Sequence, residues 1–150
     1  MERGCRKVGN GSGARLNAAL QKGSAMKSAP AHYPARAPID AYGNGGFRFA
    51  DMSHRGSILI VPSGIYAWNV ASMDDVDADR CALFFRELKS PAFILLGTGV
   101  THVMPDAALR KAFADASLGL EPMSTGAACR TYNVLLAEGR DLGAALIAVD

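Results

Sequence analysis

The chain has 150 residues, of which 49% are hydrophobic and 20% charged, and its net charge is +2. This length and composition predict one globular domain that can build a core without disulfides or metals. No apolar run approaches the roughly 20 residues that span a bilayer, so no transmembrane segment is expected. Residues 1–36 hold seven Lys or Arg against one Glu, whereas residues 37–150 hold nine basic and thirteen acidic residues. The mildly acidic remainder argues against nucleic-acid binding.

Residues 1–37 form a basic leader rich in Gly, Ala, Ser and Arg, and residues 38–150 form the predicted single α/β domain. Three interpretations of the leader stay open. Its composition is typical of a disordered segment, and an arginine-rich, acid-poor stretch is also typical of an organelle-targeting segment. In the third interpretation the true start is Met26 rather than Met1. We expect a cytoplasmic protein if the source is bacterial, and a mitochondrial one if the leader is a transit peptide.

The cysteines are three in number and scattered, and they form no C-x-x-C pair. None of the three histidines stands at metal-ligand spacing from a cysteine. This pattern predicts a reducing compartment, no structural metal and no cofactor. The cysteines are Cys5, Cys81 and Cys129.

The first half of the predicted domain is antiparallel. Residues 39–42 and 46–49 flank a Gly-Asn-Gly turn and carry alternating aromatic positions, which indicates a hairpin. Residues 57–61 are rich in β-branched side chains and predict a strand, and residues 65–68 predict its antiparallel partner.

The second half alternates helices and strands. The expected order is a helix over 73–88, a buried strand over 93–96, a helix opening at Pro105, a strand over 119–123, a helix over 125–137 that Gly139 caps, and a strand over 144–149. Strands that alternate with helices imply right-handed crossovers and parallel pairing. Joined to the antiparallel half, this predicts a mixed sheet with helices packed against it.

The glycine turn after the 93–96 strand is the first candidate site. Gly97 and Gly99 on either side of Thr98 let the backbone turn sharply and let a ligand or a neighbouring helix approach closely. A dinucleotide fingerprint would need a third glycine where His102 stands and an immediate helix, which Pro105 delays. The pattern therefore favours a tight strand-to-helix turn over a nucleotide site.

The start of the 125–137 helix is the second candidate site. Ser124 and Thr125 are suited to cap the helix, and a helix N-terminus is a natural anion site. Cys129 lies in the first turns, where the helix dipole lowers a thiol pKa, and Asn133 shares its face. Only His102 offers a basic partner for such a thiol. The alternative interpretation is a buried cysteine that packs as a small apolar residue.

Charged side chains cluster at two further places, around Gly139 and between residues 74 and 79. Glu138 and Arg140 bracket Gly139 and are placed to pair with each other or with a loop. The acids between 74 and 79 lack the glycine and closing glutamate of a calcium loop, so a solvated, helix-starting face is expected there. The candidate ligand-binding residues are Gly97, Thr98, Gly99, His102, Thr125, Cys129, Asn133 and Arg140.

Four segments, in order and at matching separations, carry a family resemblance over nearly all of residues 39–149. They are 56–64 (GSILIVPSG) followed by Trp68, 95–99 (LLGTG), 128–133 (ACRTYN), and 137–140 (AEGR) with 144–147 (AALI). Together they resemble the MTH 938-like family, small α/β proteins catalogued as a domain of unknown function.

The resemblance implies a single three-layer α/β domain with a central mixed sheet. The family's eukaryotic relative is a mitochondrial assembly factor for the respiratory NADH dehydrogenase, complex I. The positions that match the family's motifs are Gly97, Thr98, Gly99, Thr125, Asn133 and Arg140, and the resemblance gives them no catalytic role. The basic leader lies outside the matched region.

Three functions follow as hypotheses. The first is a non-enzymatic interaction or assembly protein with a protein partner in respiratory complex assembly. The second is a binder of a small anionic ligand, or an enzyme, that uses the Gly97–Gly99 turn and the Thr125 helix start. The third is a thiol enzyme built on Cys129. A cleft lined together by Thr98, His102, Thr125 and Asn133 would favour the second.

Overall fold

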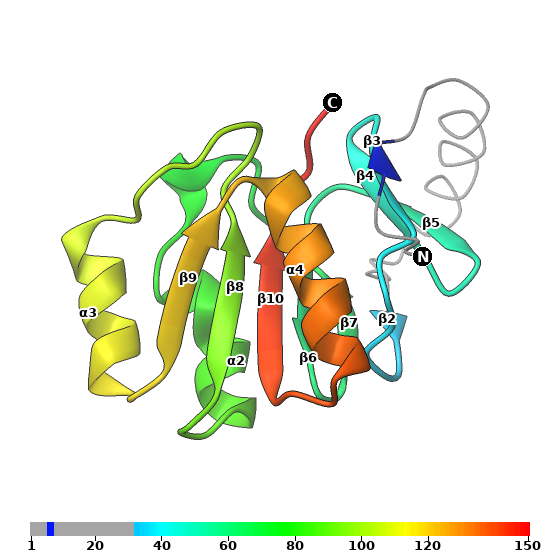
Figure 1. Ribbon diagram of the computed structural model, residues 1–150. Helices are drawn as coiled ribbons and strands as arrows, with labels where there is room; N and C mark the ends of the chain where they lie inside the picture. The colour runs from blue at the N-terminus through cyan, green and yellow to red at the C-terminus, as the bar shows by residue number, and fades with distance from the viewer. Residues whose placement is uncertain (1–5, 8–31) are drawn as a thin grey trace.

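The computed structural model describes residues 6–7 and 32–150, which include ten strands, two 3-10 turns and three α-helices (Figure 1). The strands are β1 (Arg6–Lys7), β2 (His32–Tyr33), β3 (Ala41–Gly43), β4 (Gly46–Phe49), β5 (Met52–Arg55), β6 (Ile58–Val61), β7 (Gly64–Ala67), β8 (Phe93–Gly97), β9 (Gly119–Met123) and β10 (Leu142–Leu146). The 3-10 turns are η1 (Met73–Asp75) and η2 (Asp79–Cys81), and the α-helices are α2 (Ala82–Glu87), α3 (Ala107–Asp115) and α4 (Thr125–Ala137).

The central sheet has the strand order β2-β7-β6-β10-β8-β9. Strands β8, β9 and β10 are parallel to one another, whereas β6 pairs antiparallel with β10 and with β7, which in turn pairs antiparallel with β2. A second sheet has the order β1-β3-β4-β5, in which β3, β4 and β5 are antiparallel. The mixed sheet predicted from the sequence is therefore confirmed.

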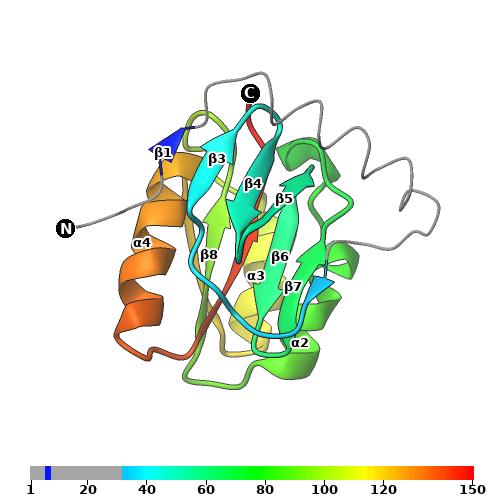
Figure 2. The ribbon, with the colours of Figure 1, turned by 90° about the vertical axis from the view of Figure 1, so that its right-hand side faces the viewer.

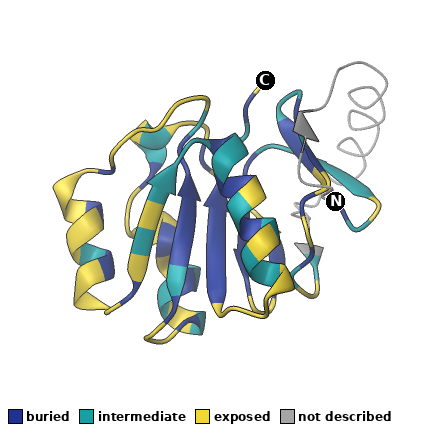
Figure 3. Ribbon diagram, in the orientation of Figure 1, coloured by how far each residue is buried: buried dark blue, intermediate teal, exposed yellow. Residues whose placement is uncertain are grey.

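The molecule has three layers, because each face of the central sheet is covered by different elements (Figure 2). Alternate side chains of a strand point to opposite faces. On β8, Ile94 and Leu96 pack with Phe84 of α2 and Phe113 of α3, whereas Leu95 belongs to a second cluster. That second cluster is made with α4 and the small sheet, through side chains that include Tyr132, Ala128, Phe47 and Phe49. Strands β8 and β10 are buried almost throughout, while the helices keep an exposed face (Figure 3).

The predicted helix over residues 73–88 is wrong in its first half. Residues 73–75 and 79–81 form 3-10 turns, and the α-helix covers only 82–87. The Asp75 carboxylate accepts hydrogen bonds from the Ala71 and Ser72 N–H groups, and Asp77 accepts one from the Arg80 N–H. Short acidic side chains that bond to nearby backbone groups compete in this way with continuous helix.

Other elements also differ from the prediction. Pro105 lies outside α3, because Asp106 is the N-cap and accepts from the Leu109 N–H at 2.9 Å. The last strand, predicted over 144–149, covers 142–146, so it begins two residues and ends three residues earlier, and it pairs along the whole of β8. Strand β5 was not predicted, since its four residues are all half-buried and lack an alternating apolar pattern.

The predicted leader, residues 1–37, falls mostly outside the described residues. Its described parts form β1, which pairs with β3, and β2, which pairs with β7. Arg36 Nη1 donates to the Leu142 carbonyl oxygen at 3.1 Å. Strand pairing thus begins before the predicted boundary at residue 38.

Candidate functional site

The start of α4 is fixed by the fully buried Thr125 hydroxyl. Thr125 Oγ1 donates to the Ile147 carbonyl oxygen at 2.8 Å and accepts from the Gly99 N–H at 3.0 Å. The Thr125 N–H donates to the Gly99 carbonyl oxygen at 2.8 Å. Ser124 is the N-cap, as predicted, and its Oγ accepts from the Ala127 N–H. The helix start is therefore bonded to the segments that follow β8 and β10.

The β8–α3 loop, residues 98–106, is held by one buried hydroxyl, that of Thr98. Thr98 Oγ1 donates to the Thr101 carbonyl oxygen at 2.6 Å and accepts from the Val103 N–H at 3.0 Å. Gly99 has a φ of +115°, which side-chain-bearing residues rarely adopt. Thr98 and Gly99 therefore shape the loop, and the tight turn expected there is present.

Gly97 allows the close approach of a helix. A Cβ atom at Gly97 would lie 3.0 Å from the Thr125 Cα and 3.1 Å from a methyl group of Leu146. The sequence left open whether a ligand or a helix approaches this glycine, and the neighbour in the fold is α4.

Asn133 binds the main chain of a distant segment. Its Oδ1 accepts from the Ile39 N–H at 2.8 Å, and its Nδ2 donates to the Ile39 carbonyl oxygen at 2.9 Å. The preceding residue is Tyr132, whose buried hydroxyl donates to the Ala37 carbonyl oxygen at 2.9 Å. Burial raises the pKa of Tyr132 far above its ordinary value, so the phenol keeps its proton. These two side chains hold the strand-like segment that leads into β3.

The structure separates the remaining candidates. Cys129 is fully buried in the core between α4 and the sheet, whereas His102 is exposed on the β8–α3 loop. Arg140 follows the C-terminus of α4, where its guanidinium lies 5.8 Å from the centre of the Phe93 ring. Its Nη1 is 3.8 Å from Glu138 Oε1, the pairing that the sequence suggested. Arg140 is therefore at the opposite end of β8 from the glycine turn.

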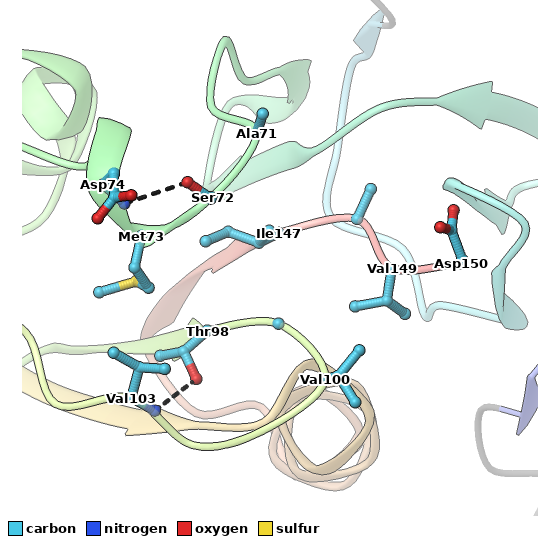
Figure 4. A pocket seen from close by; sticks show the side chains of 12 residues that line it. Ala71, Ser72, Met73, Asp74, Thr98, Val100, Val103, Ile147, Val149 and Asp150 are labelled. Atoms are coloured by element: carbon cyan, nitrogen blue, oxygen red, sulfur yellow. Dashed lines mark hydrogen bonds between the residues drawn. The ribbon is translucent and has the colours of Figure 1, made fainter.

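A groove of about 620 Å³ lies beside the glycine turn (Figure 4). Three segments line it: residues 71–74, residues 98–100 with Val103, and residues 147–150. Met73 points from one wall toward Thr98 and Val103 on the other. Of the eight candidate residues, only Thr98 and Gly99 line this groove, so it is not the cleft shared by Thr98, His102, Thr125 and Asn133 that would favour an enzyme.

The groove combines exposed aliphatic side chains with acidic groups. Val100 is 78% exposed and Val103 39% exposed, and the adjoining Met104 is 59% exposed. The ionisable side chains that line the groove are both acidic, Asp74 and Asp150. Sequence reasoning missed this site because its walls come from three segments far apart in the chain. The exposed Val-Thr-His-Val-Met run after the glycine turn was the one signal available.

The α/β domain and the sequence motifs described above lie in a segment that matches one protein family. Residues 39–147 match the family described as a protein of unknown function (DUF498/DUF598). The chain belongs to this family. The match covers the central sheet from β6 to β10, all three α-helices and the β3–β5 hairpins.

Solved structures of this family share the fold. A crystal structure described as an outer membrane protein from Bartonella henselae is 49% identical, with a TM-score of 0.73 over 79% of this chain and 100% of that one. A solution structure from Bordetella pertussis, described as a Mth938-like domain, is 25% identical, with a TM-score of 0.62 over 75% of this chain and 85% of that one. The MTH 938-like resemblance and the three-layer α/β fold are thus confirmed.

A curated relative of the family carries a functional name. NADH dehydrogenase [ubiquinone] 1 alpha subcomplex assembly factor 3 of Homo sapiens is 31% identical over 109 residues. The alignment covers 73% of this chain and 59% of the human protein. The chain therefore matches somewhat more than half the length of that relative.

Within residues 6–7 and 32–150, no helix is long and apolar enough to cross a membrane. The same residues contain no group of three or more His, Cys, Asp or Glu side chains placed to hold a metal ion.

Proposed function

We propose that this chain is a non-enzymatic interaction protein that acts in the assembly of respiratory complex I. The observation that carries the proposal is its 31% identity to the human assembly factor 3 over 109 residues, 73% of the chain. Because the chain covers only 59% of that protein, the assembly role is a proposal for the shared domain.

The use of the motif residues supports a scaffold for protein contacts. The side chains of Thr125, Asn133 and Thr98 form hydrogen bonds with backbone groups inside the fold. A turn and a helix start that are bonded in this way hold a surface loop in place. The loop they hold carries Val100, the most exposed large apolar side chain among the described residues. Exposed apolar side chains that gather at one place mark contact sites for other proteins.

A gene deletion tests the proposal directly. We expect that loss of the gene lowers fully assembled complex I on blue-native gels at least twofold, with subassemblies accumulating, and that the intact gene restores it. Normal complex I in the deletion strain, together with no complex I subunit recovered with the tagged chain from membranes, would refute the assembly role.

A small anionic ligand at the glycine turn is the second proposal. It is favoured by the groove that Thr98 and Gly99 line, and by the open space around Gly99, where an added Cβ would meet no atom within 4 Å. The acidic Asp74 and Asp150 oppose it, because they repel an anion. Thermal shift with inorganic phosphate and nucleoside phosphates is the test. A shift that survives both Gly99→Val and Thr125→Val would place the anion elsewhere.

The cellular compartment that we propose depends on which interpretation of the leader, residues 1–37, is correct. We propose the cytoplasm if the chain is bacterial, and the mitochondrion if residues 1–37 act as a transit peptide. A reporter fused to residues 1–37 and expressed in a eukaryotic cell distinguishes them. Import into mitochondria supports the transit peptide, and a diffuse reporter refutes it.

A further inference from the structure

The groove beside the glycine turn has an aliphatic wall that the fold holds rigidly. Val100 lies between two anchored points, since Thr125 Oγ1 accepts from the Gly99 N–H and Thr98 Oγ1 accepts from the Val103 N–H. The exposure of Val100 and Val103 is therefore built into the loop. A binding surface that is already ordered loses less conformational entropy when a partner binds.

Each of the other two segments that line the groove carries one acidic residue, Asp74 or Asp150. Asp74 is exposed, and its neighbour Asp75 already uses its carboxylate on the Ala71 and Ser72 N–H groups. Among the side chains of residues 33–150, no Lys or Arg lies within 4 Å of a carboxylate oxygen of Asp74 or Asp150, although Arg55 Nη1 and Asp150 Oδ1 both lie close to Gly45. The groove therefore offers two carboxylates to a partner without a basic side chain of its own in its lining. Complementary charge selects partners and steers their approach.

We propose that this groove binds a short polypeptide segment of a partner protein, in which aliphatic side chains are flanked by Lys or Arg. The aliphatic side chains contact Val100, Val103 and Met73, and the basic groups lie against Asp74 and Asp150. This assignment rests on the proposed role as an interaction protein and specifies the chemistry of the partner. The volume of about 620 Å³ falls in the range of sites that bury compact groups of side chains.

The first test uses a peptide panel and the full chain. Three fluorescein-labelled 12-residue peptides share the same Leu and Val positions and carry Lys, Ser or Glu at all other positions. We expect the Lys peptide to bind at least tenfold more tightly than the Ser peptide, with the Glu peptide weakest, and its affinity to fall as salt rises. Amide shifts in NMR spectra should map to residues 71–74 and 98–104. Equal affinity for the Lys and Glu peptides, or shifts confined to other surfaces, would overturn the proposal.

Matched variants locate the binding. Val100→Asp should weaken binding of the Lys peptide at least tenfold, whereas Val134→Asp, at a 57% exposed valine on α4, should change it less than twofold. Asp74→Lys should weaken binding at least fivefold. Asp141→Lys makes the same charge change directly before β10, outside the groove lining, and should leave binding within twofold. Circular dichroism checks that each variant folds. Equal losses for Val100→Asp and Val134→Asp would contradict the groove.

The outcome is separable from that of the assembly role. If deletion impairs complex I and the Val100→Asp and Asp74→Lys variants both restore it fully, the assembly role stands and the groove assignment falls. If complex I is normal in the deletion strain and the tagged chain recovers no complex I subunit, while the Lys peptide maps to the groove, the groove assignment stands and the assembly role falls. Sedimentation that shows a dimer of this chain dissociated by Val100→Asp would assign the groove to a second copy and overturn the proposal.

Discussion

The amide of Asn133 makes two hydrogen bonds to the main chain of a distant segment. It satisfies both main-chain polar groups of Ile39, a residue that is itself fully buried. We expect Asn133→Ala to lower the free energy of unfolding by about 1–3 kcal/mol, because it leaves an N–H and a carbonyl without partners. Urea unfolding followed by circular dichroism measures this.

The neighbouring exposed position provides the control for Asn133. Val134→Ala removes an exposed side chain from the same helix and should change stability by less than about 0.5 kcal/mol. If Asn133→Ala is as mild as Val134→Ala, the hydrogen bonds to Ile39 do not stabilise the fold as described.

His54 makes stability depend on pH. Burial lowers the pKa of His54 below its ordinary value of 6.5, although a hydrogen bond with the backbone at Ser57 acts in the opposite direction. His54 Nε2 has no hydrogen-bond partner among the described residues. The unfolded chain therefore binds more protons than the folded chain as the pH falls below 6.5, and the free energy of unfolding should fall with it.

Urea unfolding at pH 7.5 and at pH 5 measures the pH effect. His54→Gln should reduce the loss of stability between the two pH values. His102→Gln, at an exposed histidine, should leave that loss unchanged. An identical pH dependence in the wild type and in His54→Gln would contradict the burial of a neutral imidazole.

At the scale of single residues, the sequence predicted the features that depend on neighbours in the chain, such as the ends of α4. Ser124 caps α4, and Gly139 follows it with a φ of +75°. It could not predict that Asn133 faces Ile39, because 94 residues separate them. It also could not decide whether Cys129 is reactive or buried, since the answer depends on packing between α4 and the sheet.

At the scale of elements, the docking of α4 on the central sheet depends on Gly97. Gly97→Ala places a Cβ 3.0 Å from the Thr125 Cα, so helix and strand must move apart. We expect a loss of about 1–3 kcal/mol in the free energy of unfolding, as for other overpacked sites. Differential scanning calorimetry or urea unfolding measures it.

Gly139 is the comparison for Gly97. A Cβ there meets nothing within 4 Å, and its φ of +75° is one that asparagine tolerates. Gly139→Asn should therefore cost less than about 1 kcal/mol. If Gly97→Ala costs no more than Gly139→Asn, α4 does not rest on the β8 backbone as tightly as described.

Element type was predictable where apolar periodicity was strong. The strand over 93–96 and the helix over 125–137 were found within one residue. The helix over 73–88 was overextended, because Asp75 and Asp77 bond to nearby backbone groups and interrupt it. Strand β5 has no apolar alternation, and its place is set by pairing with β4.

At the scale of the whole molecule, the order of elements determined the fold and the family, but not the groove. Its three walls are the segments that follow β7, β8 and β10, and these strands finish at the same end of the central sheet. No local pattern in any one of them indicates the other two. The assembly role likewise depends on a surface that forms only in the folded domain.

One measurement tests the assembly role and its surface together. The tagged chain, cross-linked in intact cells that express it, is captured from solubilised membranes, and complex I subunits are quantified by mass spectrometry. We predict that complex I subunits are enriched with the wild type and with Val134→Asp, and at least fivefold less with Val100→Asp. The account would be contradicted if the wild type enriched no complex I subunit, or if Val100→Asp enriched them as well as Val134→Asp does.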